Sequence, residues 1–420
     1  MKTKFIIVGT GNRGLGCFAK GLLGFANKGL PEFTERAELL ALVDNNPLRG
    51  RAAAGELKRP DMPVFATVAQ AQQAVHADWA IVTTPDNTHC QVVIEALESG
   101  LNVIVDKPLA TSAWECDRII AAMQRTGRDV RVGHNMRYHD WTLMAARMVR
   151  AGDIGEVISV EAAEVLDYSH GGDYFHRWHS DFSKSRGLMN HKCCHHLDVI
   201  CWILDDEPAA VTAFGGRRFY RPRPELGHGQ RCLDCGLAAK CPHYFEMGKW
   251  DGVYTRLFQQ AEPADGYIRD LCVFSDRHTI NDHESLSIRF RKGTLANFSL
   301  VAFAPREYWY FNFTGTTGRL EMGLNSWDAK PYLRIVRADG KVENVDFTRE
   351  GGEHGHGGAD IALIADILGV GQSHPLQRAT PVEARRAVLV ADLAARSIAT
   401  GRPAMAEDAG RDLPPPPPRG

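Results

Sequence analysis

The predicted fold depends on one stretch, Leu101-Asn102-Val103-Ile104-Val105-Asp106-Lys107-Pro108-Leu109-Ala110. Its apolar centre is typical of a buried strand, and this strand stops at the charged pair Asp106 and Lys107. In open α/β sheets, ligands bind outside the carboxyl ends of the strands. Lys107 is therefore a candidate for a ligand site, although a surface ion pair at a strand end would explain the same two charges.

A glycine-rich turn near the start of the chain favours the ligand site. A short apolar strand over residues 4–8 leads into Gly9-Thr10-Gly11-Asn12-Arg13-Gly14, and a helical run follows over residues 15–23. In G-x-G-x-x-G the first glycine permits a tight turn, the second lets the backbone approach a pyrophosphate, and the third lets helix pack on strand. We therefore predict that all six residues contact a dinucleotide, with its phosphates at the helix amino terminus.

The second predicted strand, residues 38–43, ends at an acidic residue, Asp44, which Asn45 follows. An acid at this position is the usual partner of the adenosine ribose diol, which favours NAD over NADP. Arg49 and Arg51 follow closely and are able to neutralise a 2′-phosphate, so NADP stays open. Asp44 and Asn45 are predicted cofactor contacts.

A polar loop, Thr84-Pro85-Asp86-Asn87-Thr88-His89, follows a strand-like run over residues 79–83, and a helix is predicted over residues 90–99. This loop, the glycine motif, Asp44 and Asp106-Lys107-Pro108 together resemble the glucose–fructose oxidoreductase, inositol dehydrogenase and rhizopine-catabolism (Gfo/Idh/MocA) family. The family motif is usually Glu-Lys-Pro, so Asp106 is a small departure. The resemblance continues through residues 133–138 and 152–155, and thins after about residue 215. It implies further cofactor contacts at Thr84, Pro85, Asn87, His89, Asp106, Lys107 and Asn135.

Two domains are expected. Strands and helices alternate through about residue 130, which is typical of a doubly wound parallel sheet, so residues 1–133 form an α/β Rossmann domain that binds NAD or NADP. Strand-like runs then follow with few helices between them over residues 157–165, 210–214, 285–290, 294–303, 308–314 and 331–336. Residues 134–408 are therefore predicted to be an α+β domain with a large open, mainly antiparallel sheet. The tail, residues 409–420, has five consecutive prolines and is predicted to be disordered.

Composition excludes several classes of protein. The chain has 420 residues, of which 44% are hydrophobic and 24% charged, as in globular proteins. A formal net charge of −2 gives no global field for nucleic acid or an acidic membrane. The sequence contains no apolar run of about 18 residues, and the run before Gly9 is too short for a signal peptide. We expect a cytoplasmic protein without membrane or nucleic-acid partners, whose ten cysteines are thiols or metal ligands.

The predicted chemical residues lie on a helix expected over residues 188–204. His191, His195 and Asp198 would share one face of this helix. In the family this helix typically carries Asp-x-x-x-His, and the resemblance implies that His195 acts on the substrate hydroxyl while His191 stands in place of the aspartate. The acid–base pair is then His191 and His195, or His195 supported by another group. Because histidines at i and i+4 can also bind a metal, that alternative stays open.

The expected reaction is hydride transfer from a hydroxyl carbon of a sugar, glycoside or cyclitol to nicotinamide. His195 would remove the hydroxyl proton, and Lys107 would donate a hydrogen bond to the developing alkoxide. The predicted substrate contacts are Lys107, Arg137, Tyr174, His176, Arg177, His191 and His195. Two alternatives stay open. The first is a glycoside hydrolase that oxidises its substrate transiently and recycles its NAD. The second is a non-catalytic dinucleotide-binding subunit with a regulatory or assembly role. The resemblance also implies a homo-oligomer, dimer or tetramer, formed through the second sheet.

An insertion at about residues 215–275 carries its own motif. Cys232 and Cys235 form Cys-x-x-Cys, and Cys241 follows six residues later. This is good zinc-knuckle spacing, with Cys272 as the favoured fourth ligand and His228 or His243 as alternatives. We expect a structural zinc here, and reduced thiols or an iron–sulfur cluster are the other interpretations.

Overall fold

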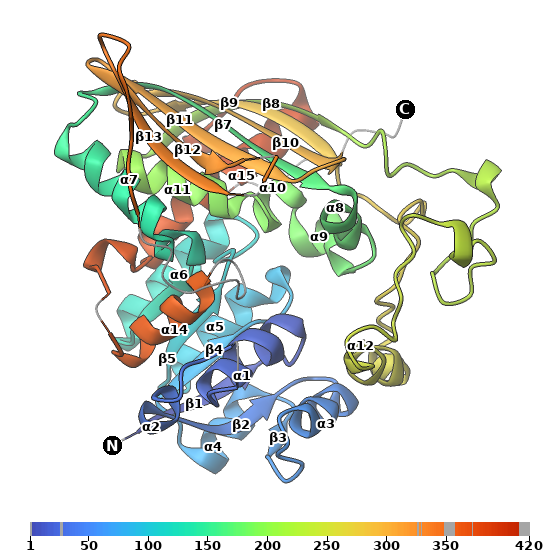
Figure 1. Ribbon diagram of the computed structural model, residues 1–420. Coiled ribbons are helices and arrows are strands. Elements are labelled where there is room, and N and C mark those ends of the chain that lie inside the picture. Colours follow the sequence, from blue (N-terminus) through green and yellow to red (C-terminus); the bar gives the residue numbers. More distant parts are fainter. Residues whose placement is uncertain are drawn as a thin grey trace.

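The computed structural model describes residues 2–25, 28–325, 327–328, 330–347, 358–371 and 373–410. Two sheets organise these residues, and they lie apart with helices between them (Figure 1). The α/β fold class predicted from the sequence is confirmed for both halves of the chain.

The first sheet is parallel throughout and has six strands in the order β3-β2-β1-β4-β5-β6. This is the Rossmann order, in which the strand order reverses between the first and fourth strands. The strands are β1 Thr3–Val8, β2 Ala37–Val43, β3 Val64–Phe65, β4 Trp79–Val82, β5 Asn102–Asp106 and β6 Val130–Gly133. On β5, Val103 and Val105 pack in a different buried cluster from Ile104, which explains why every central residue is apolar.

Helices cover both faces of this sheet. The predicted helix over residues 15–23 is a π-helical segment, Gly14–Ala19, that continues into α1, Lys20–Leu22. Ser112 caps α6 by accepting from the backbone N–H of Glu115, while the Glu115 carboxylate accepts from Thr111 rather than from Ser112. The other helices of this region are α2 Phe33–Arg36, α3 Pro47–Glu56, α4 Val68–Val75, α5 His89–Glu98 and α6 Ala113–Thr126.

The second sheet has nine strands in the order β14-β13-β12-β11-β7-β10-β9-β8-β15. Its strand pairs are antiparallel except β7 with β10, so the predicted open, mainly antiparallel sheet is confirmed. The sequence did not predict β12, β14 or β15. The strands are β7 Val157–Asp167, β8 Pro208–Gly216, β9 His283–Phe290, β10 Leu295–Ala304, β11 Tyr308–Gly315, β12 Gly318–Leu324, β13 Pro331–Arg337, β14 Val342–Asn344 and β15 Ala404–Met405.

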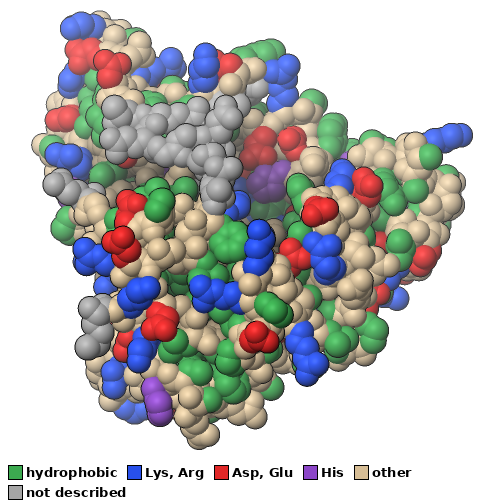
Figure 2. Space-filling view, turned by 60° about the horizontal axis from the view of Figure 1, so that its bottom comes forward, with side chains coloured by type: hydrophobic (Ala, Val, Ile, Leu, Met, Phe, Trp, Pro, Cys, Tyr) green, Lys and Arg blue, Asp and Glu red, His purple; other side chains and the backbone are tan. Residues whose placement is uncertain are grey.

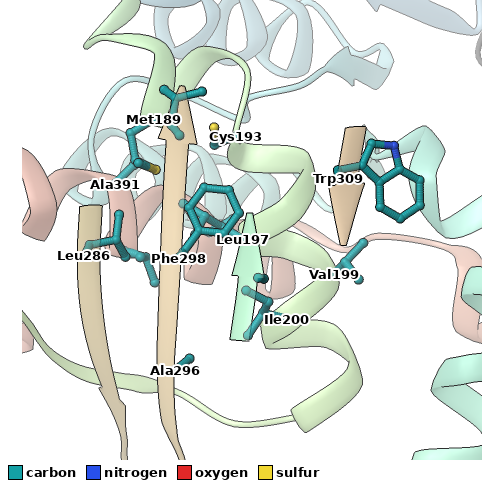
Figure 3. Close-up of a cluster of buried hydrophobic side chains, with 14 of the residues drawn as sticks. Met189, Cys193, Leu197, Val199, Ile200, Leu286, Ala296, Phe298, Trp309 and Ala391 are labelled. Atoms are coloured by element: carbon teal, nitrogen blue, oxygen red, sulfur yellow. The ribbon is translucent and has the colours of Figure 1, made fainter. Parts of the chain in front are cut away.

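One face of the second sheet is covered by helices. Side chains alternate between buried and exposed along β9 and the first part of β10, as expected where a sheet has one packed face. Leu197 and Ile200 of α11, Cys194–Leu204, lie against Phe298 of β10 (Figure 3). Helix α15, Pro381–Thr400, packs against both β8 and α11. The remaining longer helices are α7 Asp140–Ala151, α8 Tyr168–Phe175 and α14 Ala359–Leu368.

The single helix predicted over residues 188–204 is wrong. The chain forms α10, Leu188–His191, and then α11, with a break at Lys192 and Cys193. The backbone N–H groups of Lys192 and Cys193 both donate to the carbonyl oxygen of Leu188, at 2.8 and 2.9 Å. The carbonyl oxygen of His191 accepts instead from Lys107 Nζ at 2.9 Å. This tertiary hydrogen bond takes the place of the one that would continue the helix.

Residues 217–282 form an excursion between β8 and β9, and Figure 1 shows it running from the second sheet down to the edge of the Rossmann sheet. It contains α12 Val253–Leu257 and α13 Glu262–Asp265, and α12 packs against α3. The domain boundary at residue 133 stays a prediction. Of the predicted disordered tail, residues 411–420 lie outside the described residues. Within the part of the chain that the structure describes, no helix is long and apolar enough to cross a membrane.

Candidate active site

The three motif glycines have the surroundings that a dinucleotide turn requires. A Cβ atom on Gly14 would lie 2.0 Å from the carbonyl oxygen of Gly9, so the helix start can approach the strand only with glycine there. Gly9 has a φ of +90°, in the left-handed region. Around a Cβ built on Gly11 no atom lies within 4 Å, which leaves its backbone open to a ligand. The turn therefore fits a pyrophosphate.

A cleft of about 1170 Å³ runs from this turn to the helices of the second domain. In the space-filling view, acidic and histidine side chains lie at the floor of a hollow near the centre of the face shown (Figure 2). The cleft is lined by most of the predicted site residues, namely Gly9, Gly11, Asn12, Arg13, Asp44, Asn45, Thr84, Pro85, Asn87, His89, Asp106, Lys107, Asn135, Tyr174, Arg177, His191 and His195. Thr10 and Gly14 lie behind them and shape the turn.

Asp44 is fixed at the end of β2. Its Oδ2 accepts from the backbone N–H and hydroxyl of Thr10, at 2.9 and 2.6 Å. Its Oδ1 accepts from the backbone N–H of Asn46 at 2.9 Å and lies 3.4 Å from Arg49 Nη1. The Asp44 carboxylate thus connects the glycine turn to the residue that caps α3. Asp44 also lines the cleft.

Asp360 joins Arg13 and Asn135, two residues predicted to contact the cofactor. Arg13 lies 3.2 Å from Asp106 and 2.9 Å from Asp360. Asn135 Nδ2 donates to the other oxygen of Asp360 at 2.8 Å. Asp360 is the second residue of α14, more than 200 residues beyond Asn135, and no local motif in the sequence marks it.

His89 braces the loop that follows β4. Its ring nitrogens lie 2.8 Å from the carbonyl oxygen of Pro108 and 2.9 Å from that of Thr84. Burial lowers the pKa of His89, and a neutral ring can donate to only one of these two oxygens. The contact couples the loop to the turn that carries Lys107.

His191 connects Lys107 to a buried carboxylate. Its Nδ1 lies 2.7 Å from Oδ2 of Asp86, and its backbone carbonyl accepts from Lys107 Nζ. Burial, with Lys107 and Arg177 nearby, lowers the pKa of His191 well below its ordinary value. The imidazole is therefore neutral near pH 7 and a weak base.

Aromatic and charged side chains surround this group. The ring centroid of His191 lies 4.0 Å from that of His179, 5.4 Å from Trp178 and 5.6 Å from Tyr174. Arg177 forms an ion pair with Asp173 at 2.6 Å and lies over the Tyr174 ring. This end of the cleft therefore offers a polar wall with aromatic faces, which suits a ligand rich in hydroxyl groups.

Two predicted substrate contacts do not reach the cleft. Arg137 has no exposed surface, and its guanidinium donates to both oxygens of Asp198, at 2.8 and 2.7 Å. This bidentate pair turns the guanidinium into the core and away from the cleft, so nothing in the structure supports the predicted substrate role. His176 lies within hydrogen-bonding distance of the carbonyl oxygen of Leu271, at 2.6 Å, and lines a separate cavity beside the cysteines. A burial-driven fall in the pKa of His176 to about 4 keeps its ring neutral there.

Comparison with known proteins agrees with this arrangement. The family model described as "Oxidoreductase family, NAD-binding Rossmann fold" (GFO_IDH_MocA) matches residues 3–134, and that of the family's C-terminal alpha/beta domain matches residues 146–406. The chain belongs to the Gfo/Idh/MocA oxidoreductase family. It is accordingly an oxidoreductase with an NAD-binding Rossmann fold.

Individual members of the Gfo/Idh/MocA family show how far this likeness extends. YteT of Bacillus subtilis (strain 168), which is named as an oxidoreductase, is 26% identical over 386 residues, or 86% of this chain and 88% of YteT. Inositol 2-dehydrogenase of Gluconacetobacter diazotrophicus is 29% identical over 222 residues, which is 52% of this chain and 63% of that enzyme. The solved oxidoreductase domain protein from Kribbella flavida shares the fold, with a TM-score of 0.69 at 18% identity over 96% of this chain and 99% of its own.

In this Gfo/Idh/MocA member a carboxyl group contacts His191 from a part of the chain where the sequence did not predict one. The helix position where the family typically has aspartate is His191, and Asp86 of the cofactor loop supplies a carboxylate to it from the other domain. Asp86 lies in the predicted cofactor loop, but no motif in the sequence indicates a role for it. The loop motif marked the right segment, but the pairing across 105 residues had no sequence signal.

The four predicted zinc ligands gather around a second cavity of about 410 Å³. Backbone N–H groups of Phe245 and Gly229 point to the sulfur atoms of Cys232 and Cys235, each at 3.3 Å. Among the residues described, however, no group of three or more His, Cys, Asp and Glu is arranged to hold a metal ion. The described histidines between residues 170 and 196 likewise form no group of three or more that is arranged to hold a metal ion. A structural zinc at Cys232, Cys235, Cys241 and Cys272 therefore stays a prediction without support from the structure.

Proposed function

We propose that the protein is an NAD(P)-dependent dehydrogenase that acts on a hydroxyl carbon of a sugar, glycoside or cyclitol. The supporting observation is that Lys107, His191 and His195 line the same cleft as the glycine turn. The name of the related inositol 2-dehydrogenase favours a polyhydroxylated substrate. NAD, when bound, supplies the acceptor for the hydride that leaves the hydroxyl carbon.

In this proposal Lys107 and His195 act on the reacting hydroxyl. The C–H bond breaks with its electron pair, and the O–H proton moves to the imidazole of His195, which later releases it to solvent. The Lys107 ammonium donates a hydrogen bond to the oxygen as negative charge develops on it. We assign the proton to His195, which the family resemblance places at the substrate hydroxyl, and not to His191, whose lowered pKa makes it a poor base.

His191 and Asp86 are positioning residues in this proposal. Asp86 fixes the His191 ring, and the His191 carbonyl fixes the Lys107 ammonium group at 2.9 Å. The ring of Trp178 offers an apolar face to a sugar, while Tyr174 and Arg177 offer hydrogen-bond donors to neighbouring hydroxyls. Each of these side chains lines the cleft beside His191.

We propose NAD as the preferred cofactor, because Asp44 at the end of β2 lines the cleft where the adenosine ribose is expected.

We also propose a homo-oligomer formed through the uncovered face of the nine-stranded sheet. Ile158 of β7, Phe214 of β8 and Leu295 of β10 are 51%, 76% and 55% exposed, and large apolar side chains on a sheet face favour association. Cytoplasmic residence stays a prediction.

Purified protein with NAD and a panel of inositols, free aldoses and glycosides tests this function through the absorbance of NADH. At least one polyol should be oxidised, and Lys107→Ala should lower kcat by at least about 100-fold. NAD affinity in that variant should stay within about tenfold, because the glycine turn and Asp44 are untouched. Lys341→Ala is the matched control, since Lys341 is an exposed lysine beside the edge strand β14. Near-normal turnover by Lys107→Ala would contradict the role of Lys107.

A further inference from the structure

The excursion of residues 217–282 covers one end of the dinucleotide cleft. Tyr254, Leu257 and Phe258 belong to the same buried cluster as residues of β1, β2 and α3. Asn46, which caps α3, donates its side-chain amide to the carbonyl oxygen of Ala261 at 2.9 Å. The excursion is thus packed on the segment that directly follows Asp44, and its side chains line the cleft there.

Arg49 lies where the excursion meets the expected ribose site. Its guanidinium lies 3.4 Å from Asp44 and 2.5 Å from Asp265, and the centroids of the Phe258 and Tyr267 rings are each 5.9 Å away. The Arg49 side chain is only 12% exposed. Two carboxylates and two aromatic rings, three of these four groups from the excursion, therefore hold this cation. Arg51, the other arginine near Asp44 in sequence, is exposed and does not line the cleft.

Charge decides which nucleotide this arrangement accepts. Arg49 carries one positive charge and the two carboxylates carry two negative charges, so the group has a net charge of −1. A 2′-phosphate carries about −1.5 to −2 and needs a cation that is not already neutralised. A ribose diol instead donates hydrogen bonds to carboxylates and needs no cation.

We infer that Asp265 determines cofactor specificity by neutralising Arg49 and thereby excluding the 2′-phosphate of NADP. This inference rests on the proposed use of NAD at Asp44 and extends it to a residue some 220 positions further along the chain. The glycine turn and Asp44 alone leave the choice of nucleotide to Arg49. The excursion makes that choice, because it supplies the second carboxylate.

Titration calorimetry of the full chain with NAD and with NADP tests the inference without any sugar substrate. Asp265→Asn keeps the size of the side chain and changes the net charge of the group from −1 to 0. The ratio of the NADP Kd to the NAD Kd should fall about tenfold or more. Asp234→Asn, in the same excursion but exposed and outside the cleft, should leave the ratio unchanged.

The variant Arg49→Leu/Asp265→Asn separates Arg49 from a general charge effect. It restores the net charge of −1 through Asp44 alone, so its ratio should return toward that of the unaltered protein. A ratio within twofold in Asp265→Asn, or retained NADP affinity in the double variant, would overturn the inference. Tighter binding of NADP than NAD by the unaltered protein would also overturn it. A protein that binds NAD but oxidises no polyol would contradict only the proposed reaction.

Discussion

Replacing Asp86 by asparagine tests whether the cofactor loop positions the chemical groups of the other domain. Asp86 is buried, with 3% of its side chain exposed, and its Oδ2 lies 2.7 Å from His191 Nδ1. An asparagine of the same shape keeps the packing but removes the carboxyl group, whose pKa burial raises well above its ordinary value while Lys107 opposes this shift. The amide can also present its NH₂ group to Nδ1, which would reverse the proton positions on the imidazole ring.

The size of the effect follows from the one interaction that changes. Leaving a buried hydrogen-bonding group without its partner costs about 1–3 kcal/mol. If the Asp86–His191 bond holds the His191 carbonyl beneath Lys107, its loss should lower kcat/KM by roughly 10- to 100-fold. The affinity for NAD should change little, because the Asp86 carboxyl group bonds to His191 and not to the glycine turn or Asp44. The loss should fall mainly on kcat, since Lys107 acts on the oxygen as charge develops.

The assay is NADH formation with the best polyol, measured as kcat/KM against pH for the unaltered protein, Asp86→Asn and the control Asp61→Asn. Asp61 is an exposed aspartate in the same half of the chain and does not line the cleft. With His195 as the proton acceptor, the acidic limb of the profile should stay in place while its height falls. An acidic limb displaced in Asp86→Asn would refute this reasoning and assign the proton to His191. A loss below about threefold would refute the positioning role itself.

Two further predictions concern stability and metal content. Asp198→Asn should destabilise the fold by about 3–5 kcal/mol in urea unfolding, because it leaves Arg137 buried beside an uncharged partner, whereas Arg137→Met/Asp198→Leu should cost much less. Burial alone would raise the pKa of Asp198, but the nearby Arg137 outweighs it, so the pKa of Asp198 is lowered in the folded protein. The ionised Asp198 therefore stabilises the fold at pH values above the unfolded pKa of about 3.9, and this stabilisation is lost as the pH falls below that value. The pH dependence should be absent from Asp198→Asn. If zinc is bound, elemental analysis should find about one zinc per chain, and chelation should speed proteolysis near residues 220–250 first. Metal-free protein in which residues 220–250 are equally protected from proteolysis would contradict the zinc prediction. A large rise in the KM of Asp198→Asn without loss of stability would contradict the core role of Arg137.

The parallel sheet could be predicted because its signals are local. Each strand is a short apolar run that ends at a polar turn, and the glycine motif fixes the first turn by steric need at Gly9 and Gly14. The position of Lys107 follows from the same logic, since β5 ends at Asp106 and the carboxyl end of a parallel strand faces the ligand. Six strands of the second sheet were predicted from their apolar and alternating runs, but β12 was missed although Arg319-Leu320-Glu321-Met322 alternates. The short edge strands β14 and β15 have too few residues to show a period.

The errors arise where a distant residue changes a local preference. The sequence favoured one helix over residues 188–204, but the bond from Lys107 to the His191 carbonyl ends α10 there. Arg137 follows a strand of the cofactor sheet and was expected in the cleft. Its partners Asp198 and Glu383 lie 61 and 246 residues further along the chain, and together they draw the guanidinium into the core. Helical spacing and strand position carry no information about such pairs.

The absence of the helix aspartate was the main reason to consider a non-catalytic subunit. A carboxyl group hydrogen-bonded to an imidazole fixes the orientation of the ring. Asp86 Oδ2 lies 2.7 Å from Nδ1 of His191 and is able to do so here. We therefore infer that His191 has its carboxyl partner on the cofactor loop, which also lines the dinucleotide cleft. The orientation of His191 and Lys107 would then depend on the cofactor loop. Because a carboxyl group lies beside His191, the missing helix aspartate is no longer a reason to expect a non-catalytic subunit.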